Sequence, residues 1–267
     1  MDTQFCFRQL FADKGKEFVN VIKEFNFEDF NDLQDLMKAF SHIKIRDNFI
    51  LDAYYAGDMS FGAVMKLYAV RLNCKNQYYP VSEKVLNRFK NYEQFLDWFR
   101  DENKFVKKML IQPFTDGHYI EGTIPWEASE TVPRLEKYLV YDFTPIAIWE
   151  ALLLLEVTHL YLPHFWHAGV GRGMLVVDDI TLVEACTNSD FVRGDVVDYS
   201  KLLGNTGMLL PIVEIKSSSL AYASYCYWND WTGLSCVTHE ITKIGSEVIY
   251  HKIDERVLIE YNCRVRF

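Results

Sequence analysis

The sequence predicts an α+β protein with a helix-rich N-terminal half and a mainly antiparallel sheet in the C-terminal half, packed on a buried central helix at about residues 145–162. Three observations predict this fold class. Apolar residues recur at spacings of three and four through about the first 110 residues, as on one face of a helix. From Met174 onward the spacing is two, which is the period of a strand. Between these regions lies a segment that is apolar on nearly every side, as a fully buried helix is.

The elements of the N-terminal half follow from apolar spacing and from capping residues. One helix is expected after the acidic pair at 28–29, with an apolar face made of Phe30, Leu33, Met37 and Phe40. A later helix is expected to begin at Ser82, a good N-cap. Asn91 with Gln94 resembles a capping box, and a helical apolar stripe continues beyond it to Leu110. The segment 61–72 is rich in β-forming residues, so we predict a strand or hairpin arm there, with a helix as the alternative.

The central helix has the clearest start signal. Thr144 is suited to the N-cap position, and Pro145 fits the first helical position, where a missing N–H is tolerated. Glu150, Glu156 and a histidine interrupt the apolar run, which is expensive at the centre of a bilayer. We therefore predict a buried helix that ends at Pro163, not a membrane span.

The C-terminal half contains short runs of period two separated by polar turns, at 174–177, 181–185, 209–216, 220–228, 234–242 and 246–253. Short turns at Gly245-Ser246 and Asp254-Glu255 indicate an antiparallel meander. The final run is expected to be a strand with a buried apolar face, made of Val257, Ile259, Tyr261, Cys263, Val265 and Phe267.

The domain organisation is predicted from a change in composition near residues 112–122. We expect a helix-rich region at 1–115 and an acidic α+β region with C-terminal antiparallel strands at 116–267. A single compact domain over 1–267 is the alternative. A chain of 267 residues with 49% apolar content can form a core without disulfides or a structural metal.

Acidic residues are concentrated in one part of the chain. Residues 116–200 contain fourteen acidic and four basic side chains, whereas the rest of the chain is nearly balanced. Such a field repels the phosphates of nucleic acids and anionic lipids and speeds encounter with a basic protein. We therefore expect a basic protein partner, no nucleic acid and no membrane. A solubilising surface without a partner is the alternative interpretation.

The N-terminal sequence lacks the basic segment and the apolar core of a signal peptide. The six cysteines are scattered and include no C-x-x-C pair. We therefore expect a cytoplasmic protein with free thiols.

The densest group of metal-capable side chains lies at the end of the central helix. Glu156 and His159 are three residues apart and share a helix face, and His164 and His167 can complete a metal site where the chain turns at Pro163. A metal-bound water with Glu156 as ligand or base would make the protein a metal-dependent hydrolase. Alternatively, the histidines form hydrogen bonds at the helix end. The motif H-E-x-x-H is absent.

Other catalytic patterns fail on spacing or context. The glycines at 169–173 follow a helix and lead into a strand, which is the reverse of a nucleotide-binding loop, so we predict a turn. Cys236 and His239 are three apart on a predicted strand and point to opposite faces, which makes a poor nucleophile and base. We expect no cofactor and no catalytic residue.

Aromatic residues gather around a turn-like dipeptide, Asn229-Asp230, at what we predict to be a hairpin tip. Exposed Trp and Tyr carry much of the binding energy at interfaces, although such rings also build cores. The tip residues proposed to bind a partner are Tyr227, Trp228, Asn229, Asp230 and Trp231.

These observations favour a non-enzymatic binding protein for a basic macromolecular partner, for example an inhibitor or immunity-type protein in which carboxylates mimic phosphate. The acidic residues expected to take part are Glu121, Glu127, Glu130, Asp178 and Asp179. The alternative is the metal-dependent hydrolase that uses Glu156, His159, His164 and His167.

Overall fold

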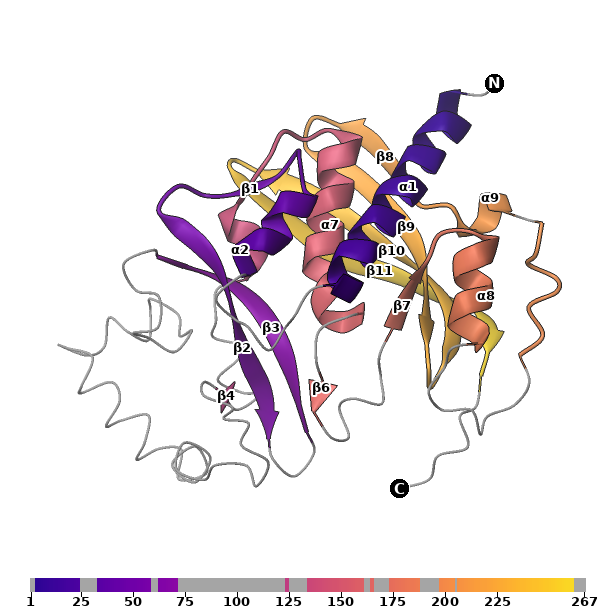
Figure 1. The fold of residues 1–267 in the computed structure, drawn as a ribbon. Helices are drawn as coiled ribbons and strands as arrows, with labels where there is room; N and C mark the ends of the chain where they lie inside the picture. The colour runs from indigo at the N-terminus through magenta and orange to yellow at the C-terminus, as the bar shows by residue number, and fades with distance from the viewer. Residues whose placement is uncertain are drawn as a thin grey trace.

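The computed structural model of the chain describes residues 3–24, 33–58, 62–71, 123–124, 134–160, 164–165, 173–187, 197–204 and 206–261. Within them, helices and antiparallel sheets form a mixed α+β fold (Figure 1), so the α+β class is confirmed. In these ranges no helix is long and apolar enough to cross a bilayer. The helix expected from Ser82 falls outside them, so the helix-rich N-terminal half and the division into two regions stay predictions.

The largest described sheet is antiparallel, with the strand order β11-β10-β9-β7, and β8 also pairs with β9. Its strands are β7 (Gly173–Val176), β8 (Ile212–Ser217), β9 (Leu220–Asn229), β10 (Gly233–Ile244) and β11 (Glu247–Glu260). The predicted turn at Gly245-Ser246 is confirmed. Gly245 has a φ of 63°, a left-handed conformation that favours glycine.

The segment 181–185 is not the predicted strand but part of helix α8 (Asp179–Thr187). A reciprocal cap starts this helix. Oδ1 of Asp178 accepts a hydrogen bond from the N–H of Thr181 at 2.8 Å, and Oγ1 of Thr181 accepts one from the N–H of Asp178 at 3.0 Å. Leu182 and Ala185 are buried on one helix face. In a run of five residues, the spacing of apolar side chains is too short a pattern to distinguish one face of a helix from the alternation of a strand.

The predicted turn at Asp254-Glu255 is also wrong, because β11 continues through both residues and pairs with β10. β11 is the last strand in the order of this sheet. Charged side chains suit such an edge strand because they discourage pairing with another chain.

The predicted buried face of the final strand is wrong at Val257, which is 46% exposed. A register shift between β10 and β11 leaves Leu258 without an opposite residue. Such a bulge breaks the alternation of period two, so Val257 and Ile259 no longer share one face. Ile259 and Tyr261 pack against buried residues, as expected, and residues 262–267 lie outside the described ranges.

The predicted strand at 61–72 is confirmed as β3 (Gly62–Arg71), which pairs with β2 (Phe49–Asp58) in a long hairpin that extends away from the large sheet (Figure 1). Short strands β4 (Thr123–Ile124) and β6 (His164–Phe165) flank this hairpin. A further small sheet joins β1 (Lys44–Ile45) to β5 (Leu139–Val140).

The remaining described elements are helical. The helix expected after residues 28–29 appears as a short helix, α2 (Leu33–Leu36), followed by a 3-10 turn at Met37–Ala39. The helices are α1 (Thr3–Glu24), α2 (Leu33–Leu36), a 3-10 helix at Leu135–Tyr138, α7 (Pro145–Leu160) and α9 (Thr206–Leu209). Helices α1 and α7 lie against the large sheet, and α8 lies beside β7 (Figure 1).

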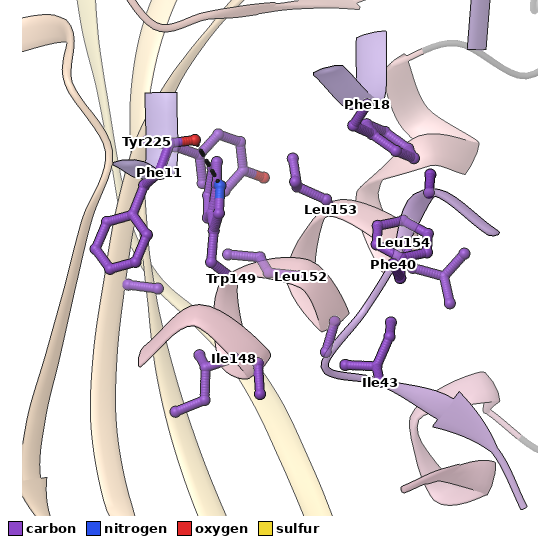
Figure 2. Packing of buried hydrophobic residues seen from close by; sticks show 14 of the residues in the cluster. Phe11, Phe18, Phe40, Ile43, Ile148, Trp149, Leu152, Leu153, Leu154 and Tyr225 are labelled. Carbon is purple, nitrogen blue, oxygen red and sulfur yellow. Dashed lines mark hydrogen bonds between the residues drawn. The ribbon is translucent and has the colours of Figure 1, made fainter. Parts of the chain in front are cut away.

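Two groups of buried residues occupy opposite faces of β9 and β10, because alternate side chains point to opposite sides of a strand. We call the group on the α7 side the inner cluster; it includes Phe11, Trp149, Leu152, Tyr225 and Val237. The Trp149 ring lies 5.9 Å from that of Tyr225, and its Nε1 donates to the carbonyl of Phe11 at 2.9 Å (Figure 2). The group on the α8 side is the outer cluster, made of Val176, Leu182, Ala185, Leu209, Cys226, Trp228 and Leu234.

Candidate functional site

A polar pair links α7 to β10 at the edge of the inner cluster. Oε1 of Glu156 lies 3.6 Å from Nε2 of His239, which is only 6% exposed. The imidazole of His239 stacks on the Tyr225 ring, with 5.9 Å between centroids and 2° between planes. Burial, followed by the charge of Glu156, raises the pKa of Tyr225 well above its ordinary value. Tyr225 therefore stays a neutral phenol beside the carboxylate.

A second carboxylate extends this polar group toward the sheet edge. The hydroxyl of Tyr227 donates to Glu255, whose other oxygen accepts from Nζ of Lys252 at 2.7 Å. The Lys252 bond, followed by the Tyr227 bond, lowers the pKa of Glu255. Tyr225 and Tyr227 connect the two carboxylates, with 6.5 Å between ring centroids.

A carboxylate paired with a histidine has the chemistry of a general acid–base, but that role needs room for a reactant. The void described beside Glu156 is about 10 Å³ and is lined by Trp149, Leu152, Leu153, Leu175 and Tyr225. A water molecule needs roughly this much space and polar partners on several sides. In the part of the chain described, the Glu156–His239 pair therefore holds α7 against the sheet.

The predicted metal site is tested only in part by this arrangement. Among the described residues, no three His, Cys, Asp or Glu side chains are placed to hold a metal ion. Glu156 contacts His239, a residue far along the chain. His159 lies on α7 and His164 on β6, but their side chains, and all of His167, are outside the described part. The metal-ligand assignment stays a prediction.

Sequence reasoning missed His239 as a partner of Glu156. A signal was present, because Val237, His239 and Ile241 occupy alternate positions of β10 and therefore share the face that packs toward α7. A polar residue on such a face requires a partner from the element that covers it.

A fully buried carboxylate, Glu150, joins three separate segments. It accepts hydrogen bonds from the N–H of Ser41 at 3.1 Å, from the N–H of His42 at 2.7 Å and from Nδ1 of His42 at 3.0 Å, and Nζ of Lys14 on α1 lies 3.6 Å away. Burial by itself would raise the pKa of Glu150. The bonds from His42 and Ser41 and the charge of Lys14 outweigh burial and lower it.

Ser41, His42 and Glu150 resemble a nucleophilic triad only in composition. In such a triad one imidazole nitrogen faces the hydroxyl and the other faces the carboxylate. Here Nδ1 of His42 lies 3.0 Å from both Oγ of Ser41 and Oε1 of Glu150. One nitrogen cannot serve both roles at once, so Glu150 holds the Ser41-His42 loop on α7.

The predicted aromatic tip forms the turn between β9 and β10. Trp228 is 2% exposed, and its Nε1 donates to Oδ1 of Asp230 at 2.9 Å. Oδ1 of Asn229 accepts from the N–H of Trp231 at 2.8 Å, which closes the turn. Trp228 therefore belongs to the outer cluster, while Tyr227 and Trp231 are half-buried. Of the two tryptophans of which one was expected near solvent, Trp228 is buried and Trp231 is partly exposed, and the partner-binding role of the tip stays a prediction.

Of the predicted acidic partner residues, Glu121, Glu127 and Glu130 lie outside the described part. Asp178 caps α8 and forms an ion pair with Lys16. Burial acts to raise the pKa of Asp178, but the hydrogen bonds from Lys16 and Thr181 and the charge of Lys16 together outweigh burial and lower it. Oδ2 of Asp179 accepts from the N–H of Gly204 at 3.0 Å.

Two exposed apolar side chains flank Asp179. Ile180, on the first turn of α8, is 67% exposed, and Leu203, next to Gly204, is 42% exposed. Glu184 lies one turn along α8 from Ile180 and shares its helix face. We call Asp179, Ile180, Glu184 and Leu203 the α8 patch.

No protein-family model, curated protein or solved structure matches this chain.

Proposed function

We propose that the protein is a non-enzymatic binding protein for a basic protein partner, of the inhibitor or immunity type. One observation carries the proposal: the α8 patch combines two exposed aliphatic side chains, Ile180 and Leu203, with the carboxylates of Asp179 and Glu184. Interfaces commonly have this composition, with an apolar centre that is desolvated on binding and a polar rim.

The charge of the surrounding sequence supports a basic partner. The patch lies mostly in residues 116–200, where acidic side chains exceed basic ones by fourteen to four. Such an excess accelerates association with a positively charged surface, and salt weakens the effect by screening.

Trp228 of the hairpin tip packs in the cluster that α8 covers. Leu182 and Ala185, on the inner face of α8, belong to the same cluster as Trp228. Of the tip residues, Trp228 therefore contributes to the proposal by positioning α8, and Trp231 is the more exposed of the two tip tryptophans.

The test is affinity capture from a lysate of the source organism with matched variants. Ile180→Glu and Glu184→Lys alter the α8 patch, whereas Ile253→Glu and Glu214→Lys alter an exposed isoleucine and an exposed glutamate on β11 and β8. We expect a basic protein that binds the wild type and both control variants, is released by salt, and is lost with both α8 variants. Equal capture by the α8 variants, or capture that is insensitive to salt, would refute the proposal.

The second proposal is the metal-dependent hydrolase based on Glu156, His159, His164 and His167. What favours it is the buried Glu156–His239 pair, which places a carboxylate and an imidazole together next to this histidine-rich segment. A metal that binds only the native state raises the melting temperature. Metal analysis of purified protein and thermal shifts with zinc, manganese or iron test it, and the absence of both signals would remove it.

A further inference from the structure

Two cysteines of neighbouring strands face each other in the large sheet. Cys226 on β9 is the direct register partner of Cys236 on β10, and the strands are antiparallel. Directly opposed residues of an antiparallel pair point to the same face. Both side chains pack in or against the outer cluster, and the two thiols are hydrogen-bonded to each other. Both are free thiols.

The two thiols have different surroundings. Cys226 is fully buried, and its Sγ lies 3.7 Å from the carbonyl of Met208. Cys236 is half-buried and has Arg256 opposite it on β11. The hydrogen bond with Cys236, followed by burial, raises the pKa of Cys226. The same bond, followed by the charge of Arg256, lowers the pKa of Cys236 to about 7. The accessible sulfur is therefore the nucleophilic one.

The distance between the strands suits a disulfide after a small adjustment. Opposed Cβ atoms in an antiparallel pair lie about 4.5–5.5 Å apart, and a disulfide needs about 3.5–4.5 Å. A closer approach of up to about 1 Å brings the sulfurs into bonding range. We propose that Cys226 and Cys236 form a reversible cross-strand disulfide when a hydroperoxide oxidises Cys236. This inference does not depend on the proposed binding function.

The reaction proceeds in two balanced steps. The Cys236 thiolate attacks one oxygen of hydrogen peroxide, so an S–O bond forms, the O–O bond breaks and hydroxide leaves; Cys236 becomes a sulfenic acid. The Cys226 sulfur then attacks Sγ of Cys236, so the S–S bond forms and the S–O bond breaks. The departing hydroxide takes the Cys226 proton as water. The hydroxide from the first step takes up the proton that Cys236 lost on ionising, so two thiols are oxidised by two electrons and one peroxide is reduced to two waters.

Trypsin digestion provides a direct test on the full chain. Lys216 and Lys243 are consecutive tryptic sites, so both cysteines fall in one peptide, 217–243. After treatment with hydrogen peroxide and alkylation of the remaining thiols, we expect this peptide to be unalkylated and lighter than the dithiol form by two hydrogen atoms. Dithiothreitol should restore two alkylation sites.

Three variants assign the roles. Cys186 is a matched control because it is a half-buried free thiol near the same cluster, and burial raises its pKa to about 11. Cys186→Ser should leave the oxidised peptide unchanged. In Cys226→Ser, a sulfenic-acid reagent should label residue 236. In Cys236→Ser, the remaining Cys226 should not be labelled. Thermal melting of each variant shows whether it is folded, and Cys226→Ala replaces Cys226→Ser if the serine variant is not.

The rate of alkylation gives a second readout without peroxide. In the reduced wild type at neutral pH, Cys236 should react at least about tenfold faster than Cys186. The proposal is wrong if peptide 217–243 keeps two alkylation sites after peroxide treatment, or if Cys186 is oxidised before Cys236.

Discussion

Replacing Glu150 with glutamine tests whether the buried carboxylate holds three segments together. The variant keeps the size of the side chain, and its remaining oxygen can still accept from the N–H groups of Ser41 and His42. The amide nitrogen then faces the ammonium of Lys14, which loses its buried counter-charge. Loss of charge assistance in two hydrogen bonds and of the ion pair should cost about 3 kcal/mol of unfolding free energy.

The assay is urea unfolding followed by tryptophan fluorescence, because the adjacent Trp149 is buried in the inner cluster. Glu214→Gln is the control. Glu214 pairs with Lys216 at about half exposure, so this change should cost less than about 1 kcal/mol. If both variants lose similar stability, Glu150 does not hold the Ser41-His42 loop in the way described.

The same carboxylate predicts a pH dependence with a definite sign. The folded-state pKa of Glu150 is lowered from 4.5, so its contribution is fully present above that value and is lost as the pH falls through the folded pKa. Wild-type stability should therefore decrease more steeply than that of Glu150→Gln below about pH 4.5. Parallel curves of unfolding free energy against pH would contradict this assignment.

Five further substitutions, two of them controls, test the fold. Gly233→Ala should lower the unfolding free energy by about 3 kcal/mol, because φ is 89° and the new Cβ would lie 2.1 Å from a carbonyl oxygen of β11. Gly245→Ala is the control: φ is 63° but the space around it is open, so the loss should be about 1 kcal/mol. Equal urea midpoints for the two variants would refute the comparison. Trp149→Phe should lower the unfolding free energy by about 2–3 kcal/mol, because it removes part of a buried ring and a buried hydrogen bond to a carbonyl of α1. An unchanged melting temperature in calorimetry would contradict this prediction. Leu182→Ala should lower the unfolding free energy by about 2–4 kcal/mol, because Leu182 is fully buried. Val257→Ala should change it little, because Val257 is exposed. A larger loss in urea unfolding for Val257→Ala than for Leu182→Ala would show that Val257 is buried.

Much of the C-terminal sheet could be predicted because its strands are long and alternate regularly. The period of two in 220–228 and 234–242 depends only on residues of the same strand, and the glycine at 245 indicates the turn independently. Prediction failed where the local pattern was short or interrupted. The run 181–185 is a helix because Asp178 and Thr181 cap it reciprocally, and Val257 is exposed because a bulge shifts the face.

The candidate site was less predictable than the fold. The sequence placed Glu156 near a histidine, but its described partner is His239, which lies on another element. Asp178 and Asp179 were predicted as partner residues from charge alone. The exposed Ile180 and Leu203 that join Asp179 in the α8 patch were not predicted, because exposure depends on what covers a helix face.

The sequence by itself determined the strand periodicity of the C-terminal half, the start of a helix at Pro145 and the excess of acid in residues 116–200, because these properties depend on residues close together in the chain. Only the tertiary structure decided that Glu156 meets His239 and that Cys226 meets Cys236. Both pairings depend on strand register and on which helix covers which face. A shift of one residue in register would move every side chain of a strand to the other side of the sheet, so long-range packing had to select these contacts.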